Sequence, residues 1–443
     1  MSRHSSADRG PAGSGDSPGR GDSPGSDYSP GSGAAPFAGS GHPDGPLRVA
    51  LLGSGGSIGR QAVDVIARQP EAFRVVALAT GSQGRLLEEQ ARLLRPAVVS
   101  LAEERAAGRL DLPPGTEIAA GADALETLVT RSDVDLVLVA TGGLVALRSV
   151  LAALTAGKVV ATANKETLVA GGHLVMPLVR GLAAGTATAT RDPNDPLANP
   201  LGWLRPIDSE HSALWQCLVG ELPGSVARLL LTASGGPFLH ATVADLATAT
   251  PEQALRHPTW RMGAKITIDS ATMANKGLEI IEARWLYDVP YSAISVVIHP
   301  QSVVHSVVQF VDGSMKAQLG TPDMRIPIQY ALTYPARRPS PAATVDLISS
   351  QRLEFLAPDE QRFPALRIAR EAGIAGPRAS TALISADEVA VGRFLNGSLD
   401  FPGIPRLLAA AVERFGSADP REPSLEEIVA LDAEVRAFAE VAV

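Results

Sequence analysis

From residue 47 onward, short apolar runs alternate with longer segments in which apolar residues recur at helical spacing. The runs cover residues 48–52, 74–80, 97–101, 134–141 and 158–163, and each predicts a buried β-strand. The segment RQAVDVIARQ follows the first run closely, and its apolar positions indicate a helix. Strands and helices that alternate in this way predict an α/β fold with a doubly wound parallel sheet.

The pattern changes beyond this region. An extended piece ends at 206–207 and a helical pattern follows it. The segment 229–238 begins as a strand and runs into Ser-Gly-Gly. Within 265–287, the stretch after Asp-Ser-Ala-Thr has helical spacing. Residues 333–347 are rich in Pro and predict a linker. From about residue 359 the sequence has the pattern of amphipathic helices and no clustered reactive groups, which indicates a structural role for this region.

Residues 1–46 have a different composition. Ser, Gly, Pro and Asp dominate, and aliphatic residues are almost absent. Such a segment cannot bury enough apolar surface to offset the entropy lost on ordering, so we expect it to be disordered. It has no hydrophobic stretch of the kind found in secretory signals. The RGDSPG motif within it is interpreted as low-complexity sequence in preference to an adhesion peptide.

Charge and composition limit the classes of function. The net charge of −8 argues against nucleic acid and anionic membrane as main partners. The single cysteine, Cys217, excludes an internal disulfide and a Cys-based zinc site. No uninterrupted apolar run reaches about 18 residues, so we expect no transmembrane helix and a cytoplasmic location. Only five of the 39 basic residues are Lys, so each Lys is a candidate for a position that requires a compact ammonium group.

A glycine-rich turn, GSGGSIG, joins the first predicted strand to the first predicted helix. Gly53, Gly56 and Gly59 follow the spacing G-x-x-G-x-x-G, in place of the more common G-x-G-x-x-G. Backbone N–H groups in such a turn, together with the N-terminus of the helix, attract phosphate. The turn therefore favours a bound dinucleotide, with a plain tight turn as the alternative.

The end of the second predicted strand bears on the choice of nucleotide. A domain that prefers NAD usually has Asp or Glu there to bind the ribose 2′-hydroxyl. This chain has Thr80, Ser82, Gln83 and Arg85 instead, which would tolerate a 2′-phosphate. We therefore expect NADP.

The sequence PIDSEHSA at 206–213 gathers two carboxylates at a strand-to-helix junction. Asp208 and Glu210 flank Ser209, and a His follows. An N-cap with an acid in the first turn would explain one carboxylate. A site for Mg²⁺ or Mn²⁺, which prefer oxygen ligands, explains both but requires further ligands.

Glu279 is the candidate for a third acidic ligand. Asn275 and Lys276 precede it by four and three residues in a predicted helix, so the three side chains share one face. The face suits a metal ion and an anion together. A solvated helix with an ordinary salt pair is the alternative.

Two more stretches carry candidate chemistry near ends of predicted strands. Asn164, Lys165 and Glu166 follow the strand 158–163, at the edge where α/β sheets bind ligands. The alternative there is an exposed helix start. The turn after 229–233 contains Ser234 and two glycines, which can hold a phosphate or merely end the strand.

The segment 256–266 combines His257, Trp260 and Met262 with Pro and Gly. This composition suits a lid that closes over a small ligand. A loop with one buried aromatic side chain is the alternative.

Taken in order, these motifs resemble those of a known enzyme family. The quoted stretches are GSGGSIG, NKE, PIDSEHSA, LTASGGPF, HPTWRMGAKITIDSATMANKGLE and HPQSVVHSVVQFVDGSMKAQLGTPDMRIPI. They resemble 1-deoxy-D-xylulose 5-phosphate reductoisomerases of non-mevalonate isoprenoid biosynthesis, over roughly residues 47–440. The resemblance implies a homodimer that isomerises and reduces this sugar phosphate to 2-C-methyl-D-erythritol 4-phosphate with NADPH and Mg²⁺ or Mn²⁺.

The resemblance also implies a domain organisation with a Rossmann-like NADPH-binding domain, a central α+β catalytic and dimerisation domain and a C-terminal helical bundle. In this chain the expected parts are an extension (1–46), the NADPH-binding domain (47–205), the catalytic domain (206–332), a linker (333–358) and the helical domain (359–443). Residues 181–205 look longer than usual and are interpreted as a surface insertion.

The family's functional residues can be carried over by position. The resemblance implies metal ligands at Asp208, Glu210 and Glu279. It implies catalytic roles for Lys165, Asp208, Glu210, Glu279 and His257. It implies substrate contacts from Lys165, Ser209, Ser234, His257, Trp260, Met262, Ser270, Asn275 and Lys276. It implies cofactor contacts from Ser54, Gly55, Gly56, Ser57, Ile58, Gly81, Ser82, Gln83, Asn164 and Glu166. Gly55 departs from the family pattern, because many relatives have Thr there.

The implied reaction uses a divalent ion as a Lewis acid and hydride from NADPH. Rearrangement by retro-aldol cleavage and re-addition and rearrangement by a direct 1,2-shift both remain open. Two other classes of protein are alternatives. Another NADP-linked oxidoreductase, such as a semialdehyde or homoserine dehydrogenase, would need a reactive Cys or different acids, and Cys217 lies in an apolar helical stretch. A non-catalytic NADP-binding protein would be expected to have lost one of the three acids.

Overall fold

The computed structural model describes residues 45–102, 110–121, 123–192, 194–350, 352–416 and 421–442. The prediction that residues 1–46 are disordered therefore falls almost entirely outside the described residues. From residue 45 onward, the described chain belongs to one compact unit.

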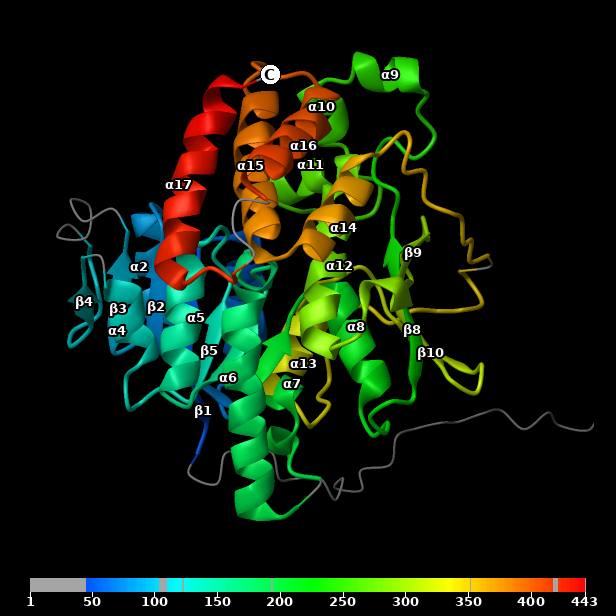
Figure 1. The fold of residues 1–443 in the computed structure, drawn as a ribbon. Coiled ribbons are helices and arrows are strands. Elements are labelled where there is room, and N and C mark those ends of the chain that lie inside the picture. Colours follow the sequence, from blue (N-terminus) through cyan, green and yellow to red (C-terminus); the bar gives the residue numbers. More distant parts are fainter. Residues whose placement is uncertain are drawn as a thin grey trace, which may run out of the picture. The chain divides into compact units, whose positions relative to one another are not determined.

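A seven-stranded parallel sheet forms the first part of the structure (Figure 1). Its strands are β1 (Leu47–Leu52), β2 (Phe73–Thr80), β3 (Val98–Leu101), β4 (Glu117–Ala119), β5 (Leu136–Val139), β6 (Val159–Thr162) and β7 (Leu204–Pro206). The helices between them are α1 (Ser57–Ala67), α2 (Gly84–Leu94), α4 (Ala124–Val129), α5 (Val145–Thr155) and α6 (Glu166–Thr190). All five predicted strands are present. Residues 49–52 are fully buried without alternation, as in parallel sheets that are covered on both faces.

The strand order explains where a ligand can bind. The order is β4-β3-β2-β1-β5-β6-β7, so the chain reverses its direction of travel across the sheet between β1 and β5. Loops diverge at such a reversal and leave a crevice at the carboxyl ends of the strands. The glycine-rich turn follows β1 at this crevice.

Residues 181–205, expected to be a surface insertion, contain regular structure, and their status as an insertion stays a prediction. Residues 181–190 continue α6, and two short helices follow, η1 (Pro196–Ala198) and α7 (Pro200–Trp203). β7 then pairs with β6, with Leu204 opposite Val160. Leu204 and Arg205 therefore belong to the sheet, and the boundary expected between residues 205 and 206 falls inside a strand. A three-residue strand that contains Arg and Pro has no apolar run to indicate it.

A second sheet has four strands in the order β11-β10-β8-β9. The strands are β8 (Val226–Ala233), β9 (Ile294–Ile298), β10 (Val304–Phe310) and β11 (Met315–Leu319). β8 and β9 are parallel, whereas β10 is antiparallel to β8 and β11. The accompanying helices are α8 (Ser209–Leu218), α9 (Val243–Ala247), α10 (Pro251–Ala254), α11 (Ala264–Thr272), α12 (Ala274–Tyr287), η2 (Tyr291–Ala293) and α13 (Arg325–Thr333).

The helix expected only after Asp-Ser-Ala-Thr begins earlier. α11 starts at Ala264 and contains these four residues, and α12 starts at Ala274. Met273 separates the two helices with φ of +64°, a conformation that non-glycine residues seldom adopt. The break allows α11 and α12 to present different side chains to the same site.

The last part of the chain is helical. Among its described residues, 334–363 form no helix or strand apart from a single bridge between Ile298 and Leu356, as the Pro-rich composition predicts. The helices α14 (Ala365–Ala375), α15 (Pro377–Leu395), α16 (Gly403–Phe415) and α17 (Leu425–Val441) follow. α15 packs against the other three and also against α6 and α11 (Figure 1). The bundle therefore supports two helices that begin close to the crevice.

One helix of the described chain, α6, is long and apolar enough to cross a membrane by length and composition alone. It packs against α5, α12 and α15, and just over half of its most apolar window is buried. Burial of this kind is what a core helix shows.

Candidate active site

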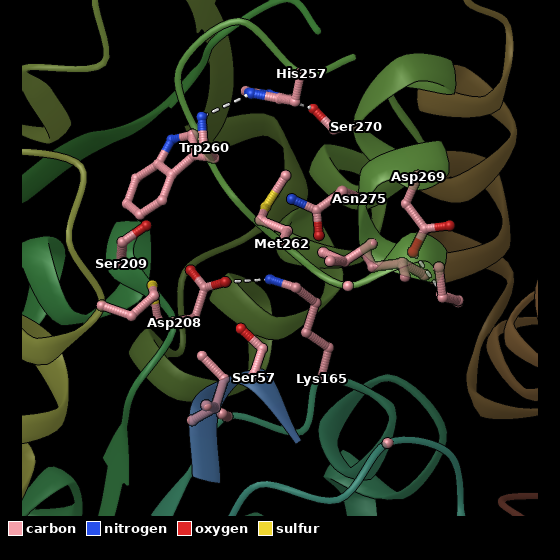
Figure 2. Close-up of a pocket in the computed structure, with 18 of the residues that line it drawn as sticks. Ser57, Lys165, Asp208, Ser209, His257, Trp260, Met262, Asp269, Ser270 and Asn275 are labelled. Atoms are coloured by element: carbon pink, nitrogen blue, oxygen red, sulfur yellow. Dashed lines mark hydrogen bonds and ion pairs between the residues drawn. The ribbon is translucent and has the colours of Figure 1, made fainter. Parts of the chain in front are cut away.

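A cavity of about 570 Å³ lies where the carboxyl ends of the central strands of the first sheet meet the end of β8. Its walls come from segments far apart in sequence, as Figure 2 shows for Ser57, Lys165, Asp208 and His257. The cavity brings together most of the residues expected at the site. These are Ser57, Ile58, Lys165, Glu166, Asp208, Ser209, Glu210, Ser234, His257, Trp260, Met262, Ser270, Asn275 and Lys276.

The loop before α8 serves as a helix cap and also supplies carboxylates to the cavity. The Asp208 carboxylate accepts hydrogen bonds from the backbone N–H groups of Glu210 (3.1 Å) and His211 (3.2 Å), which makes it the N-cap of α8. The Ser209 hydroxyl donates to Glu210 Oε2 at 2.7 Å. Capping and a role in the cavity are therefore compatible, because capping uses only one oxygen of Asp208.

Asp208, Glu210 and Glu279 form what we call the carboxylate cluster. One oxygen from each lies within 4.8 Å of the others, and Glu279 is fully buried. Burial, reinforced by the two neighbouring acids, raises the pKa of Glu210 to about 7. The raised pKa reflects first the loss of solvation around Glu210 and then the like charges of Glu279 and Asp208, which Lys276 only partly offsets.

Two lysines compensate part of this charge. Lys165 forms ion pairs with Asp208 and, at 3.3 Å, with Glu279 Oε1. Lys276 forms ion pairs with Glu279 and, at 3.5 Å, with Glu210 Oε1. Although burial alone would lower it, neighbouring carboxylates raise the pKa of Lys165 well above its usual value. Both lysines are therefore charged.

A count of charges tests whether a divalent cation fits. The groups in mutual contact are four carboxylates and two ammonium groups: Asp208, Glu210, Glu279, Glu282, Lys165 and Lys276. With all four acids ionised and His211 neutral, their charge is −4 + 2 = −2. Because Glu210 has a pKa of about 7 and Glu282 raises the pKa of His211 against the effect of burial, protons on these two groups offset part of this charge until a cation replaces them. Three converging carboxylates form an all-oxygen donor set of the kind that Mg²⁺ and Mn²⁺ prefer. The residues present therefore fit a divalent ion in both charge and chemistry.

The start of α12 is buried, and the alternative of a solvated helix with an ordinary salt pair is wrong. Lys276 is 4% exposed and Glu279 is not exposed. The Asn275 side-chain amide donates to Glu279 Oε1 at 2.6 Å, so the expected shared face exists. In this arrangement Lys276 contacts the carboxylates, so binding of its ammonium to a substrate phosphate stays a prediction.

Ser234, His257 and Ser270 form a second group, the hydroxyl cluster. His257 Nε2 lies 2.9 Å from Ser234 Oγ and 3.1 Å from Ser270 Oγ. His257 Nδ1 accepts hydrogen bonds from the backbone N–H groups of Thr259 (3.2 Å) and Trp260 (2.9 Å), so the ring proton belongs on Nε2. Burial lowers the pKa of His257 to about 4, and the ring is therefore neutral at pH 7.

The turn after β8 brings the hydroxyl cluster together. Gly235 and Gly236 have φ of +84° and +66°, and a Cβ on Gly236 would approach the Ser270 carbonyl oxygen to 2.7 Å. Only glycine permits this close passage over α11. The backbone N–H of Gly236 donates to Ser234 Oγ at 3.1 Å, which leaves the hydroxyl proton for another acceptor.

The segment between α10 and α11 covers one side of the cavity. It has no regular structure, and Trp260 and Met262 extend from it towards the interior in Figure 2. The Trp260 ring lies 5.9 Å from that of His305. This placement agrees with the expected lid residues, whereas movement of the segment stays a prediction.

The residues expected to contact a cofactor fall into two groups. Ser57, Ile58 and Glu166 line the cavity. The other expected cofactor residues lie along the turns after β1, β2 and β6, outside the cavity lining: Ser54, Gly55, Gly56, Gly81, Ser82, Gln83 and Asn164.

The first glycine of the glycine-rich turn, Gly53, is required by close packing. It has φ of +80°, and a Cβ there would lie 2.6 Å from the backbone after β5.

Asn164 has a supporting position. Its amide nitrogen donates to the carbonyls of Thr141 and Gly143, both at 2.9 Å, and its Oδ1 accepts from the backbone N–H of Thr167 at 2.7 Å. It therefore joins the loop after β5 to the start of α6. Its expected cofactor contact stays a prediction.

Sequence reasoning missed several residues at the cavity. Thr141 follows β5 and lines the cavity, and within the described residues its buried hydroxyl has no partner. Its position at the end of a predicted parallel strand was a usable signal. Glu282 Oε2 lies 3.8 Å from Lys165 Nζ and 3.2 Å from His211 Nε2. Its position three residues after Glu279 in the predicted helix could have indicated that it lies near the site.

The geometry defines a class of protein. A parallel-sheet crevice with a glycine-rich turn binds a dinucleotide, and beside it lie a site for a divalent cation and neutral donors for an anion. These features belong to a dinucleotide- and metal-dependent oxidoreductase that acts on a small anionic substrate.

Comparisons with known proteins agree with this class and narrow it. Models of 1-deoxy-D-xylulose 5-phosphate reductoisomerase match residues 49–172, and models of its C-terminal domains match residues 204–287 and 319–438. The reductoisomerase of Pelotomaculum thermopropionicum is 48% identical over 87% of this chain and 95% of its own length. That of Thermomicrobium roseum is 47% identical over 89% of this chain and 97% of its own.

Solved structures show the same relationship. The Zymomonas mobilis enzyme in complex with NADPH has a TM-score of 0.78 and 37% identity, over 89% of this chain and 98% of that one. A reductoisomerase in complex with NADPH, fosmidomycin and magnesium has a TM-score of 0.79 and 37% identity, over 89% and 97%. The chain belongs to the 1-deoxy-D-xylulose 5-phosphate reductoisomerase family.

Proposed function

We propose that the cavity converts 1-deoxy-D-xylulose 5-phosphate to 2-C-methyl-D-erythritol 4-phosphate with NADPH and a divalent cation. The observation that carries this proposal is the carboxylate cluster, in which three acids converge and which shares one cavity with the hydroxyl cluster. Membership in the family supports the identities of the substrate and the cofactor.

The carboxylate cluster would hold the metal ion through Asp208, Glu210 and Glu279. A bound divalent ion supplies Lewis-acid polarisation of adjacent sugar oxygens, and NADPH supplies the hydride. The chain's own part is to fix the donors before the ligand arrives. Ser209 and Asn275 each donate to a carboxylate of the cluster and so restrict its rotamers.

Lys165 is proposed to act at the reacting end of the substrate. Its ammonium lies between Asp208 and Glu279, at the start of α6 and within the cavity wall. A charged donor at this place can stabilise negative charge on a substrate oxygen. Glu282, behind it, keeps the ammonium oriented.

The hydroxyl cluster is proposed to bind the substrate phosphate. Ser234 and Ser270 can both donate to phosphate oxygens while the neutral His257 ring orients them through Nε2. Asn275 and Lys276 extend this site towards the carboxylate cluster. Binding energy from the phosphate would then orient the reacting carbons. Trp260 and Met262 would exclude water from the occupied site.

The decisive experiment follows NADPH oxidation by absorbance with purified enzyme and 1-deoxy-D-xylulose 5-phosphate. We expect oxidation that requires substrate and Mg²⁺ or Mn²⁺ and stops after chelation with EDTA. Undiminished turnover in EDTA, without added metal, would contradict the metal site. Absence of turnover with substrate, NADPH and metal all present would contradict the proposed function.

We also propose a homodimer formed through the second sheet. β11 is an edge strand whose residues Met315 and Leu319 are 57% and 38% exposed. An edge strand with exposed apolar side chains can pair with a second copy. Light scattering should give twice the chain mass. The division into three domains, the cytoplasmic location and the absence of nucleic-acid and membrane partners remain predictions from the sequence.

A further inference from the structure

The turn after β2 contacts the glycine-rich turn through two polar side chains. Arg60, in the first turns of α1, donates from Nε to the Gly55 carbonyl at 2.8 Å and from Nη2 to Gln83 Oε1 at 3.3 Å. Gln83 Nε2 lies 3.3 Å from the same Gly55 carbonyl. The guanidinium is therefore held over the place where the turns after β1 and β2 meet.

Gly55 makes this close arrangement possible. A Cβ there would lie 2.5 Å from Thr80 Oγ1 and 3.2 Å from the Gln83 amide group. Any side chain at residue 55 would push these groups away. Thr80, Gln83 and Arg60 thus surround one small polar surface beside the phosphate-binding turn.

Within the part of the chain that the structure describes, the charge of Arg60 has no acidic partner. Among the described residues no carboxylate lies within ion-pair distance of its guanidinium, and the side chain is exposed. Arg85, the other cation near this turn, differs in both respects. Its side chain is 93% exposed and its guanidinium lies 3.8 Å from Glu89, one turn along α2.

We propose that Arg60 distinguishes NADPH from NADH by pairing with the 2′-phosphate of the adenosine ribose. In dinucleotide-binding sheets, the residue at the end of the second strand lies beside the ribose 2′-position. The turn at residues 81–83 has no charge of its own, so Arg60 is the guanidinium held directly against it. A planar guanidinium can donate two parallel hydrogen bonds to a phosphate.

This inference rests on the proposed placement of the dinucleotide at the glycine-rich turn. The sequence led us to expect that Thr80, Ser82, Gln83 and Arg85 tolerate the 2′-phosphate, and we now assign the main contact to Arg60. Gln83 and Thr80 would then contribute neutral donors beside the cation. Arg85 would contribute only at long range.

The test measures nucleotide binding to enzyme without substrate, by fluorescence titration with NADPH and with NADH. Arg60→Gln should raise the Kd for NADPH about tenfold or more, because a charge-assisted contact is lost. The Kd for NADH should change less than about twofold. Arg60→Lys should restore part of the loss. Adenosine 2′,5′-bisphosphate should lose affinity as NADPH does, whereas adenosine 5′-monophosphate should not.

Two control variants separate the alternatives. Arg68→Gln removes an exposed arginine at the C-terminal cap of the same helix, where it pairs with Asp64, and should leave both Kd values unchanged. Arg85→Gln should change the Kd for NADPH less than about twofold. The proposal is overturned if Arg60→Gln weakens NADPH and NADH equally, or if Arg85→Gln alone removes the preference. Wild-type enzyme that bound neither nucleotide would instead contradict the proposed function.

Discussion

The carboxylate cluster and the hydroxyl cluster share one cavity but differ in charge. The first gathers three carboxylates, and Glu279 within it has no exposed surface. The second contains no charge, because burial keeps His257 neutral. The carboxylate cluster is completed by a cation, whereas the hydroxyl cluster offers hydrogen bonds to an anion.

The difference shows how two ligands of opposite charge can support each other. A phosphate in the hydroxyl cluster would be repelled by an uncompensated carboxylate cluster, because Coulomb interactions are strong in a poorly solvated cavity. A bound cation removes this repulsion. Metal binding and substrate binding are therefore expected to be coupled, and substitutions in the two clusters should have different signatures.

The largest expected effect comes from Glu279→Gln. Loss of one buried carboxylate removes a metal ligand, so kcat/KM should fall by about 10³-fold or more. NADPH should still bind with a Kd within about twofold of wild type, because the glycine-rich turn is untouched. Steady-state kinetics and fluorescence titration measure the two quantities. A variant that kept more than a tenth of wild-type activity would refute the role of Glu279.

Lys276→Ala should have the next largest effect. The ammonium neutralises two buried carboxylates in this structure and is proposed to reach the substrate phosphate. KM should rise and kcat should fall, with a combined loss of about 10²-fold, and Lys276→Arg should recover only part of it. If kinetics were unchanged and only the melting temperature moved, Lys276 would be a structural ion-pair partner.

Ser270→Ala should have a smaller and simpler effect. One neutral hydrogen bond contributes about 1 kcal/mol, so KM for the sugar phosphate should rise about fivefold while kcat changes less. Ser314→Ala, in the exposed turn between β10 and β11, is the matched control and should change neither constant. An equal fall in kcat for Ser270→Ala would place this hydroxyl at the reacting carbons instead of the phosphate.

The smallest expected effect is a pH dependence of stability due to His257. Its pKa is lowered to about 4 by burial, from about 6.5 in the unfolded chain. The unfolded chain binds the proton first, so this stabilisation is present above pH 6.5 and is lost as the pH falls towards 4. Between these values His257→Gln should lose less stability than wild type does, by about 1 kcal/mol because the ring is partly exposed. Urea denaturation of both proteins at several pH values measures the free energy of unfolding. The same pH dependence in wild type and His257→Gln would contradict a neutral buried His257.

Much of the first sheet could be predicted because buried parallel strands are continuous apolar runs. β1, β2 and β5 have this property. The turn that follows β1 could be predicted for a different reason, the spacing of its glycines. β7 could not be predicted, since it is three residues long and contains Arg205. The early start of α11 was missed because the β-branched stretch Ile266–Ile268 favours a strand, whereas packing against α15 stabilises the helix.

The site was predictable in its chemistry and less so in its contacts. Asp208, Glu210 and Glu279 could be found because their residue types and spacing favour a metal ion. The contact of Lys165 with Glu282 and His211's position beside Glu282 depend on how α12 packs against neighbouring elements. The reach of Arg60 across to Gln83 likewise depends on the meeting of two turns that are separate in sequence.

The central claim is that the carboxylate cluster binds a divalent cation, and equilibrium titration with Mn²⁺ tests it most directly. Purified chain freed of metal should bind one Mn²⁺ per chain, observed as loss of the free-ion electron paramagnetic resonance signal, with NADPH present. Glu279→Gln should abolish this binding, whereas Glu371→Gln, which alters an exposed acid on α14, should not. Binding of Mn²⁺ to Glu279→Gln with unchanged stoichiometry and affinity would contradict the account.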